Sequence, residues 1–187
     1  MLTKSEIRKE VLKKRNDIPN QIRINKSELI CNVLKQIVHD KNIKIIHIYY
    51  PIKSEVDILP FIDFCININI KLAIMSINTN KEIKNYEISK NTIFFKTHYG
   101  IYEPKEKIPF DIDILELIIV PLVAFDINKN RIGYGGGFYD RFFELVNKNN
   151  KNCLKIGVAF EEQFVDNIPI QKFDIPLNYI ITENRIL

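Results

Sequence analysis

Apolar residues recur at helical spacing in the first forty positions of the chain. Thr3 and Glu6 form a capping-box pattern ahead of the apolar positions Ile7 and Val11, which predicts a helix from residue 4 to about residue 16. Pro19 breaks this segment. A second helix is predicted over residues 21–38 from apolar positions at the same period, namely Ile30, Val33, Leu34, Ile37 and Val38.

Short apolar runs rich in β-branched residues follow, and they are too short for helices. Four of them predict buried strands: residues 44–50, 71–77, 115–122 and 154–160. The run at 115–122 is the most apolar, and it predicts a central strand that is covered on both faces. Helices are expected over residues 56–66 and 139–147, and a last short strand over residues 179–182.

The segment between residues 78 and 112 has no clear period. Residues 86–88 and 92–95 are predicted as short strands, antiparallel at an edge of the sheet. Residues 99–104 are predicted as a turn whose aromatic side chains either line a pocket or cover that edge.

The alternation of strands and helices determines the expected fold class. It predicts an α/β fold, a Rossmann-like three-layer α/β/α sandwich around a mostly parallel sheet with short antiparallel edge strands. The length of 187 residues predicts one domain, residues 1–187. The carboxyl ends of parallel strands share one edge, so the loops with Glu55, the glycine cluster, Gln163 and Asp174 are expected to lie together.

Composition excludes several functional classes. The chain is 46% hydrophobic and 27% charged, with a net charge of +4, which is typical of a globular protein and too mild to predict nucleic-acid binding. No apolar run approaches the ~20 residues that cross a bilayer, and the N-terminus lacks the apolar core of a signal peptide. Three dispersed cysteines and three dispersed histidines predict neither disulfides nor a histidine metal site. We therefore expect a cytoplasmic protein, with no membrane partner.

Residues 121–141, PLVAFDINKNRIGYGGGFYDR, carry the strongest chemical signal. Four of the six glycines lie within positions 133–137, between a predicted strand and a predicted helix. Glycines allow positive φ angles, and successive N–H groups before a helix form a cradle for anions. Arg131 would supply countercharge, and Asp140 an oxygen for Mg²⁺. The alternative is that the glycines form a turn that only joins the strand to the helix and binds no anion. The pattern is neither a Walker A loop, since no GK[ST] follows, nor the dinucleotide fingerprint, since Phe138 replaces the third glycine.

Two other pairs of residues leave alternatives open on spacing alone. Lys4 and Arg8 lie four residues apart on one helical face, as either a solvated basic face or a ligand site, with the former favoured. Glu55 and Asp57 follow a strand end, where they would either contact a ligand or form a helix cap at Asp57 beside a solvated Glu55.

The motif AFDINKNRIGYGGGFYDRF resembles the signature of the 5-formyltetrahydrofolate cyclo-ligase family, approximately AFD, a short turn and R-[LI]-G-x-G-x-G-[FY]-Y-D. Four other segments resemble family segments in the same order: KSEIR at residues 4–8, YPIKSEVD at 50–57, GIYEP at 100–104, and GVAFEEQFVDNIP at 157–169 followed by Asp174. The resemblance covers nearly the whole chain.

The resemblance implies an enzyme that converts 5-formyltetrahydrofolate to 5,10-methenyltetrahydrofolate, with ATP as co-substrate, Mg²⁺ required, and ADP and phosphate released. The formyl oxygen is a poor leaving group, and transfer of the γ-phosphoryl group activates it before N10 attacks the formyl carbon. Phosphoryl transfer requires mainly positioning and charge stabilisation. The expected partners are these small molecules alone, and we expect a monomer.

Matching positions carry the implied roles. The implied nucleotide contacts are Lys4, Ser5, Glu6, Ile7, Arg8, Arg131, Ile132, Gly133, Tyr134, Gly135, Gly136, Gly137, Phe138 and Tyr139. The implied folate contacts are Tyr50, Glu55, Tyr134, Gly135, Gly136, Gly137 and Phe138. Arg131, Tyr139 and Glu55 are the implied catalytic residues, and Asp140 and Asp174 the implied Mg²⁺ ligands.

The chain departs from the family pattern at three points. Some members carry a basic residue in the glycine cluster, where this chain has Tyr134 and Gly136, so its loop is expected to rely more on backbone N–H groups. Asn178 stands where some relatives have a second acid, and Phe138 stands where tyrosine is more usual. Phe138 is therefore expected to pack rather than to donate a hydrogen bond.

Three rival functions remain open from sequence. A sugar-phosphate isomerase or CoA transferase on a similar fold would keep an anion-binding loop without using ATP. A binding protein for folate or nucleotide would have lost turnover, although the presence of both Asp140 and Asp174 argues against this. A nucleic-acid binder using the basic N-terminal helix would show salt-sensitive binding of oligonucleotides.

Overall fold

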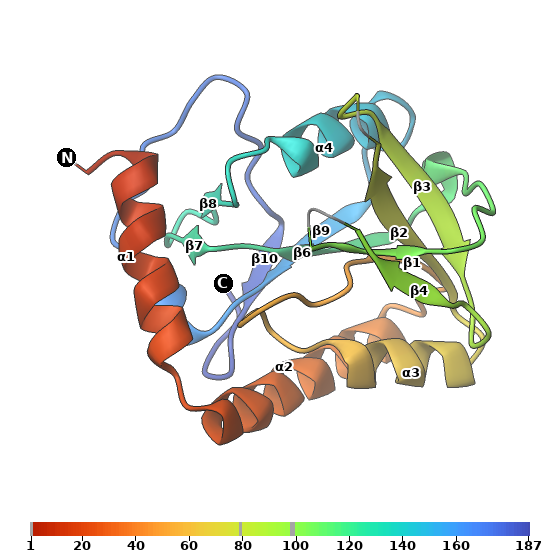
Figure 1. The fold of residues 1–187 in the computed structure, drawn as a ribbon, viewed down its shortest axis with the longest axis horizontal. Coiled ribbons are helices and arrows are strands. Elements are labelled where there is room, and N and C mark those ends of the chain that lie inside the picture. The colour runs from red at the N-terminus through yellow and green to blue at the C-terminus, as the bar shows by residue number, and fades with distance from the viewer. Residues whose placement is uncertain (1, 79, 98–99) are drawn as a thin grey trace.

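A six-stranded sheet forms the centre of the computed structural model, which describes residues 2–78, 80–97 and 100–187 (Figure 1). The strands follow the spatial order β10 (Tyr179–Ile181), β9 (Leu154–Val158), β6 (Leu117–Pro121), β1 (Ile45–Ile48), β2 (Lys71–Ile77) and β3 (Ile83–Ile88). Only β3 runs antiparallel to its neighbour, and the other strands pair in parallel. The predicted α/β fold with a mostly parallel sheet and an antiparallel edge is confirmed.

Helices cover both faces of the sheet (Figure 1). Helices α2 (Asn20–Asp40) and α3 (Leu59–Asn67) bury their apolar residues against one face. Helix α4 (Phe138–Asn149) and the short 3₁₀ helix η1 (Ile112–Ile114) pack on the other face. Two separate apolar cores result, one on each side of the sheet, and they fix the positions of the strand ends.

Helix α1 (Lys4–Asp17) stands outside these layers, at the end of the sheet next to β7 (Ala124–Phe125) and the 3₁₀ helix η2 (Glu161–Gln163). The predicted capping box is present, because Thr3 Oγ1 accepts the N–H of Glu6 and the Glu6 carboxylate accepts the N–H of Thr3. Ile7 and Val11 pack into a small third core with Val123 and Ile168. This packing aims the opposite side of α1 toward the carboxyl ends of the strands.

The long apolar run does not form one strand. Strand β6 ends at Pro121, and the chain then forms a hairpin of β7 (Ala124–Phe125) and β8 (Arg131–Ile132). The buried carboxylate of Asp126 closes the turn by accepting the N–H groups of Asn128 and Asn130. The strand predicted over residues 115–122 is therefore slightly shorter, at Leu117–Pro121, because a proline has no N–H with which to continue a ladder.

The prediction of a turn over residues 99–104 was wrong at its end. Residues Tyr102–Pro104 form β5, which pairs antiparallel with β4 (Phe94–Lys96); His98 and Tyr99 lie outside the described residues. Glu103 and Pro104 are poor strand formers, but the Tyr102 ring packs 4.5 Å from the Tyr50 ring and holds the pair in place. Tertiary packing therefore overrides local propensity here.

His47 lies within β1 and is completely buried under α4. Its ring packs 4.5 Å from the ring of Phe142, and Nε2 lies 3.1 Å from Oδ1 of Asn85. Burial lowers the pKa of His47 to about 3, against which the Asn85 contact acts weakly. The imidazole is therefore a neutral core side chain at physiological pH.

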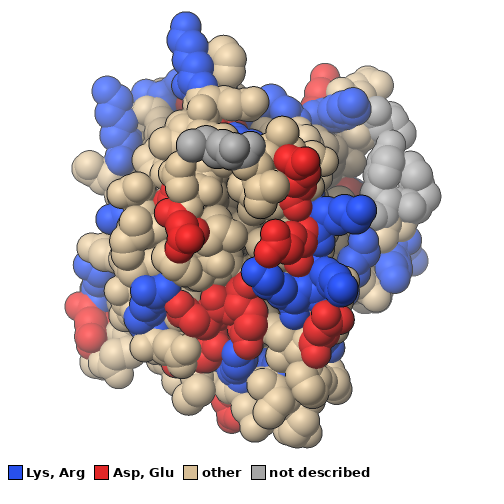
Figure 2. All heavy atoms as spheres, turned by 90° about the vertical axis from the view of Figure 1, so that its left-hand side faces the viewer, with Lys and Arg blue, Asp and Glu red and all other residues tan. Residues whose placement is uncertain are grey.

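The surface and the helices bear on possible partners. None of the helices within the described part of the chain is long and apolar enough to cross a membrane. On the face that contains α1, acidic and basic side chains are interspersed rather than gathered into a patch of one sign (Figure 2). The three cysteines, Cys31, Cys65 and Cys153, are buried and unpaired.

Candidate active site

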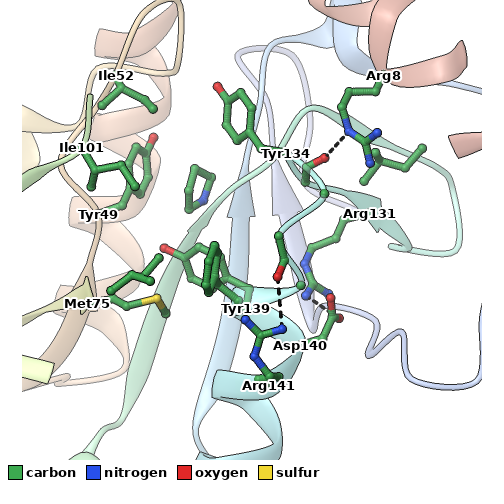
Figure 3. A pocket seen from close by; sticks show the side chains of 18 of the residues that line it. Arg8, Tyr49, Ile52, Met75, Ile101, Arg131, Tyr134, Tyr139, Asp140 and Arg141 are labelled. Carbon is green, nitrogen blue, oxygen red and sulfur yellow. Dashed lines mark hydrogen bonds and ion pairs between the residues drawn. The ribbon is translucent and has the colours of Figure 1, made fainter. Parts of the chain in front are cut away.

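A cavity of about 810 Å³ opens at the carboxyl ends of β1, β2 and β6 (Figure 3). The segments that line it come from the start of α1, residues 49–55, the strand β2, residues 131–141 and residues 171–174. The cavity thus joins segments from both halves of the chain at the sheet edge that the strand topology predicts.

Gly133–Gly137, here termed the glycine loop, runs from β8 to α4 along one wall. Gly135 and Gly137 have φ angles of +98° and +63°, a region that side chains strongly disfavour. A Cβ at Gly136 would lie 2.4 Å from the Phe138 ring. No side chain caps α4 at Gly137, so the first N–H groups of the helix remain available to a ligand at the cavity wall.

Four basic residues surround the glycine loop, and they fall into two kinds. Lys4 forms an ion pair with Asp174, and Arg131 Nη2 lies 2.7 Å from Asp140 Oδ1. In contrast, Arg8 Nε donates to Gly133 O at 2.8 Å, and Arg141 Nη1 donates to Gly136 O at 3.1 Å (Figure 3). Within residues 2–78, 80–97 and 100–187, no carboxylate oxygen lies within 4.0 Å of either of these two guanidinium groups, so both keep their charge for an anion.

Each of the two predicted metal ligands uses one carboxylate oxygen within the protein. Asp140 Oδ1 accepts from Arg131 and from the N–H of Ile175 at 3.3 Å. Asp174 Oδ2 accepts from Lys4 and from the N–H of Gln171 at 2.6 Å. No cluster of three or more His, Cys, Asp or Glu side chains suited to a metal occurs among the described residues.

The opposite wall of the cavity is mainly aromatic and aliphatic. Tyr49, Tyr50, Ile52, Met75, Ile77 and Ile101 line it. The Tyr50 ring packs 4.9 Å from Phe94 and 4.5 Å from Tyr102. The Tyr49 hydroxyl donates to Val56 O at 2.7 Å, which ties down the loop that contains Glu55.

Glu55 is the acidic group of this wall, and it is only 8% exposed. Its Oε2 accepts the N–H of Ile52 at 2.9 Å. Burial raises the pKa of Glu55, while the bond from Ile52 and the nearby Arg15 and Tyr134 oppose that rise. The alternative of a solvated Glu55 beside a helix cap at Asp57 is wrong, because Glu55 is buried and the cap residue of α3 is Ile58. Asp57 instead accepts the N–H of Leu59, the first residue of that helix.

Two tyrosines of the 131–141 segment face the cavity as neutral hydroxyls. Burial raises the pKa of Tyr134 to about 12 and that of Tyr139 well above its usual value. At physiological pH neither can act as an anionic base, so each offers a hydrogen bond through its O–H group.

Most of the residues singled out from sequence line this cavity. They are Lys4, Arg8, Tyr50, Glu55, Arg131, Ile132, Gly133, Tyr134, Gly135, Gly136, Gly137, Phe138, Tyr139, Asp140 and Asp174. Ser5 and Glu6 are exposed and Ile7 is in the core, away from the cavity lining; their role as nucleotide contacts stays a prediction. Gln163 also lies outside the lining, because it is buried and donates to Leu122 O and Val123 O.

Sequence reasoning missed two arginines near the site. Arg141 lines the cavity, and its position four residues after Gly137 could have revealed it, because helical side chains point back toward the helix start. Arg15 lies beneath the cavity and bonds to Tyr134. Arg15 falls seven residues after Arg8, on the same side of the helix, and this spacing could have indicated that it lies near the site.

Comparisons with known proteins agree on one family. The model of the 5-formyltetrahydrofolate cyclo-ligase family matches residues 1–183. The 5-formyltetrahydrofolate cyclo-ligase of Haemophilus influenzae is 28% identical over 93% of this chain and 94% of its own length, and that of Mycoplasma pneumoniae is 28% identical over 97% and 99%.

Solved structures give the same result. A 5,10-methenyltetrahydrofolate synthetase from Aquifex aeolicus superposes with a TM-score of 0.84 at 34% identity, covering 99% of this chain and 92% of that one. The synthetase from Mycoplasma pneumoniae superposes with a TM-score of 0.80 at 25% identity, covering 97% and 99%.

Proposed function

The chain belongs to the 5-formyltetrahydrofolate cyclo-ligase family, and we propose that the cavity at the carboxyl ends of its strands is the active site. The enzyme converts 5-formyltetrahydrofolate to 5,10-methenyltetrahydrofolate with ATP as co-substrate. This assignment is favoured over the isomerase or CoA-transferase alternative. The observation that supports the site most directly is that one cavity contains both the glycine loop and Glu55, which are far apart in sequence.

The reaction sets the requirements that the cavity has to meet. The γ-phosphoryl group moves from ATP to the formyl oxygen, which leaves ADP. N10 then attacks the formyl carbon, the carbon–oxygen bond breaks with release of phosphate, and N10 loses its proton. Such chemistry requires that two substrates be held in line while charge on the phosphoryl group is stabilised.

We assign ATP to the nucleotide wall, defined as the glycine loop with Lys4, Arg8, Arg131, Asp140, Arg141 and Asp174. The guanidinium of Arg8, which has no ion pair among the described residues, favours an anion there, as do the glycine-loop N–H groups and the start of α4. Arg131 is fixed by Asp140 and by Ile175 O. It would therefore meet the transferring phosphoryl group without reorganisation, which is the condition for stabilising a transition state.

We assign the folate to the folate wall, defined as Tyr49, Tyr50, Ile52, Glu55, Met75, Ile77 and Ile101. A pterin ring is flat and apolar on its faces, and aromatic side chains such as Tyr50 suit it. The carboxyl group of Glu55 offers an acceptor for the N–H donors of the ring. Tyr139, as a neutral donor between the walls, suits the formyl group.

The residues present fit a Mg²⁺ ion that is bound together with a nucleotide, rather than one held by protein ligands alone. Asp140 and Asp174 each retain one carboxylate oxygen without a hydrogen bond in the described part of the chain. Two carboxylates suffice when the remaining ligands are phosphate oxygens and water, as is usual for Mg²⁺ with a nucleotide. We propose that Asp140 and Asp174 hold Mg²⁺ together with ATP, where the ion would neutralise phosphate charge.

The decisive experiment follows the near-ultraviolet absorbance of the methenyl product. Protein, 5-formyltetrahydrofolate and Mg²⁺ are mixed first, and ATP is added afterwards. We expect the absorbance to rise only after ATP is added. ATP binding without any rise would point to a different acceptor, and neither binding nor a rise would show that the cavity has been misassigned.

We further propose that residues 1–187 act as one domain, as a monomer and in the cytoplasm. The support for one domain is that a single family model matches residues 1–183. Sedimentation of the active protein tests the monomer, because activity found only in a larger species would contradict it.

A further inference from the structure

Arg15 is a buried arginine that the proposed function does not use. It lies in α1 and is 1% exposed. A guanidinium in the interior is costly unless it is paired with an acid. Yet among the described residues no carboxylate oxygen lies within 4.0 Å of it. The position of this charge therefore needs an explanation beyond ordinary core packing.

The three hydrogen bonds of Arg15 go to three different loops beneath the cavity. Nε donates to Ser54 Oγ at 3.0 Å, Nη1 to Leu122 O at 3.3 Å and Nη2 to Tyr134 Oη at 2.7 Å. Ser54 precedes Glu55 in the folate wall, and Tyr134 belongs to the glycine loop. A single planar group thus sets the spacing between the loops that carry the two walls.

The direction of one bond adds a second consequence. Arginine has only donors, so Tyr134 Oη must be the acceptor and its own proton is left to donate elsewhere. Burial raises the pKa of Glu55, and the charge of Arg15 and the neighbouring Tyr134 hydroxyl oppose that rise. Arg15 thereby leaves the Tyr134 proton free to be donated to another acceptor at the cavity.

We propose that Arg15 is a positioning residue for the reaction, which acts through the Tyr134 hydroxyl to hold the glycine loop in register with Glu55. This inference rests on the proposed function, because register matters only if ATP and folate meet between the two walls. A displacement of about 1 Å at a reacting centre costs on the order of 100-fold in rate. Loss of the three hydrogen bonds from the Arg15 guanidinium should therefore lower turnover more than it weakens the binding of either substrate.

The first test is Arg15→Lys, with Arg23→Lys as the matched control. Lysine keeps the charge but cannot bond to three diverging acceptors. Arg23 is a partly exposed arginine on α2 whose side chain bonds only to Asn20 among the described residues. For Arg15→Lys we expect kcat to fall about 10- to 100-fold while KM for ATP changes less than about threefold. The control should match wild type, and a folded Arg15→Lys protein with wild-type kcat would overturn the proposal.

A double-mutant cycle that combines Arg15→Lys with Tyr134→Phe tests whether Arg15 acts through the Tyr134 hydroxyl. If Arg15 acts through the hydroxyl, the double variant should be no slower than Tyr134→Phe alone, because the second change removes nothing further. Additive losses in kcat would overturn the proposal. If Arg15→Lys does not fold, Tyr134→Phe still decides, since wild-type turnover in that variant is incompatible with the proposed route.

Failure of this inference is distinct from failure of the proposed function. The wild-type protein must first form the methenyl product on addition of ATP, and an inactive wild type would refute the proposed function. With an active wild type, the ratios of kcat and KM between variants test Arg15 alone.

Discussion

The two walls of the cavity are built in opposite ways. The nucleotide wall takes most of its groups from the continuous stretch 131–141 and adds the basic residues at the start of α1. The folate wall is assembled from separate strands and loops, and its members are apolar or aromatic apart from Glu55. One wall is suited to binding through charge and backbone N–H groups, and the other through the burial of a flat ring.

The comparison also separates two uses of charge. In the nucleotide wall, Asp140 is paired with Arg131, and the pair lies where phosphate would bind. In the folate wall, Glu55 is buried and has no ion pair within the described part of the chain, and its pKa rises because of that burial. The Asp140–Arg131 pair should be indispensable for turnover. The buried Glu55 should lower the stability of the fold while it helps to recognise the folate.

The largest expected effect comes from breaking the nucleotide wall. Arg131→Ala and Asp140→Asn should each lower kcat on the order of 100- to 1000-fold, because each removes charge stabilisation of the transition state. The fold should survive, which circular dichroism would check. Formation of the methenyl product measures turnover, with Arg23→Ala as the control. Near wild-type rates in either variant would refute the assignment of this wall.

The next effect concerns the folate wall. Glu55→Gln should raise KM for 5-formyltetrahydrofolate about 10- to 100-fold, the usual cost of an unsatisfied polar contact, and leave KM for ATP nearly unchanged. Steady-state kinetics with each substrate varied in turn provide the measurement. If both KM values rise equally, the two walls are not functionally separate.

Although Glu55→Gln should weaken folate binding, it should make the folded protein more stable. The pKa of Glu55 in the folded protein lies above its ordinary 4.5, so the wild-type fold loses stability as pH rises through that pKa. Glutamine keeps an acceptor for the Ile52 N–H but carries no buried charge. We expect a higher melting temperature than wild type at pH 7, and no difference below about pH 4.5. A lower melting temperature at pH 7 would show that the buried charge is well compensated.

The nucleotide wall was easier to predict from the sequence than the folate wall, because its residues are close together in the chain. Lys4, Arg131, the glycine loop and Asp140 fall within short motifs, and so a resemblance was enough to identify them. Met75 and Ile101 belong to segments that carry no chemistry of their own, and only folding brings them to Tyr50. Arg15 was missed because its value depends on Ser54 and Tyr134, which are 39 and 119 residues away.

The fold shows the same division between local and distant information. Periodicity predicted the central strands and the first two helices, since the apolar pattern follows the core. The β4–β5 pair and the β7–β8 hairpin depend on Tyr50 and on the buried Asp126. A local pattern does not report such contacts, and both elements were missed in part.

Acid offers a control on the fold itself, because His47 lies in the core beneath α4 and outside both walls. Its pKa falls from 6.5 in the unfolded chain to about 3 in the folded one. The stabilisation is therefore complete above pH 6.5 and is lost as pH falls toward 3. Between pH 7 and pH 5 this loss amounts to about 2 kcal/mol in the free energy of unfolding.

Urea unfolding of wild type and His47→Asn at the two pH values measures that loss. The variant should be less stable at pH 7 but should lose about 2 kcal/mol less than wild type on acidification. An equal loss in the two proteins would mean that His47 is accessible to protons in the folded state. Because His47 lies outside both walls, its effect on stability can be measured apart from any acid effect on substrate binding.

The smallest expected effect sharpens the comparison most, because it asks whether the nucleotide wall relies on backbone or on side-chain charge. The glycine cluster lacks a basic residue of its own, but Arg141 turns back over it, bonding to Gly136 O and lying 4.9 Å from the Phe138 ring. Exposed charges are screened by solvent, so Arg141→Ala should raise KM for ATP only about three- to tenfold and leave KM for folate unchanged.

Lys148→Ala is the matched control, since it removes the same charge from the last turn of the same helix. Wild-type KM for ATP in Lys148→Ala alongside a raised value in Arg141→Ala would show that the charge acts at the phosphates and not through the net charge of the protein. Equal values in the two variants would mean that the N–H groups of the glycine loop, together with Arg8 and Arg131, hold the nucleotide without Arg141. The nucleotide wall would then depend on backbone geometry and on the two arginines that Gly133 O and Asp140 hold in place, and not on an exposed charge.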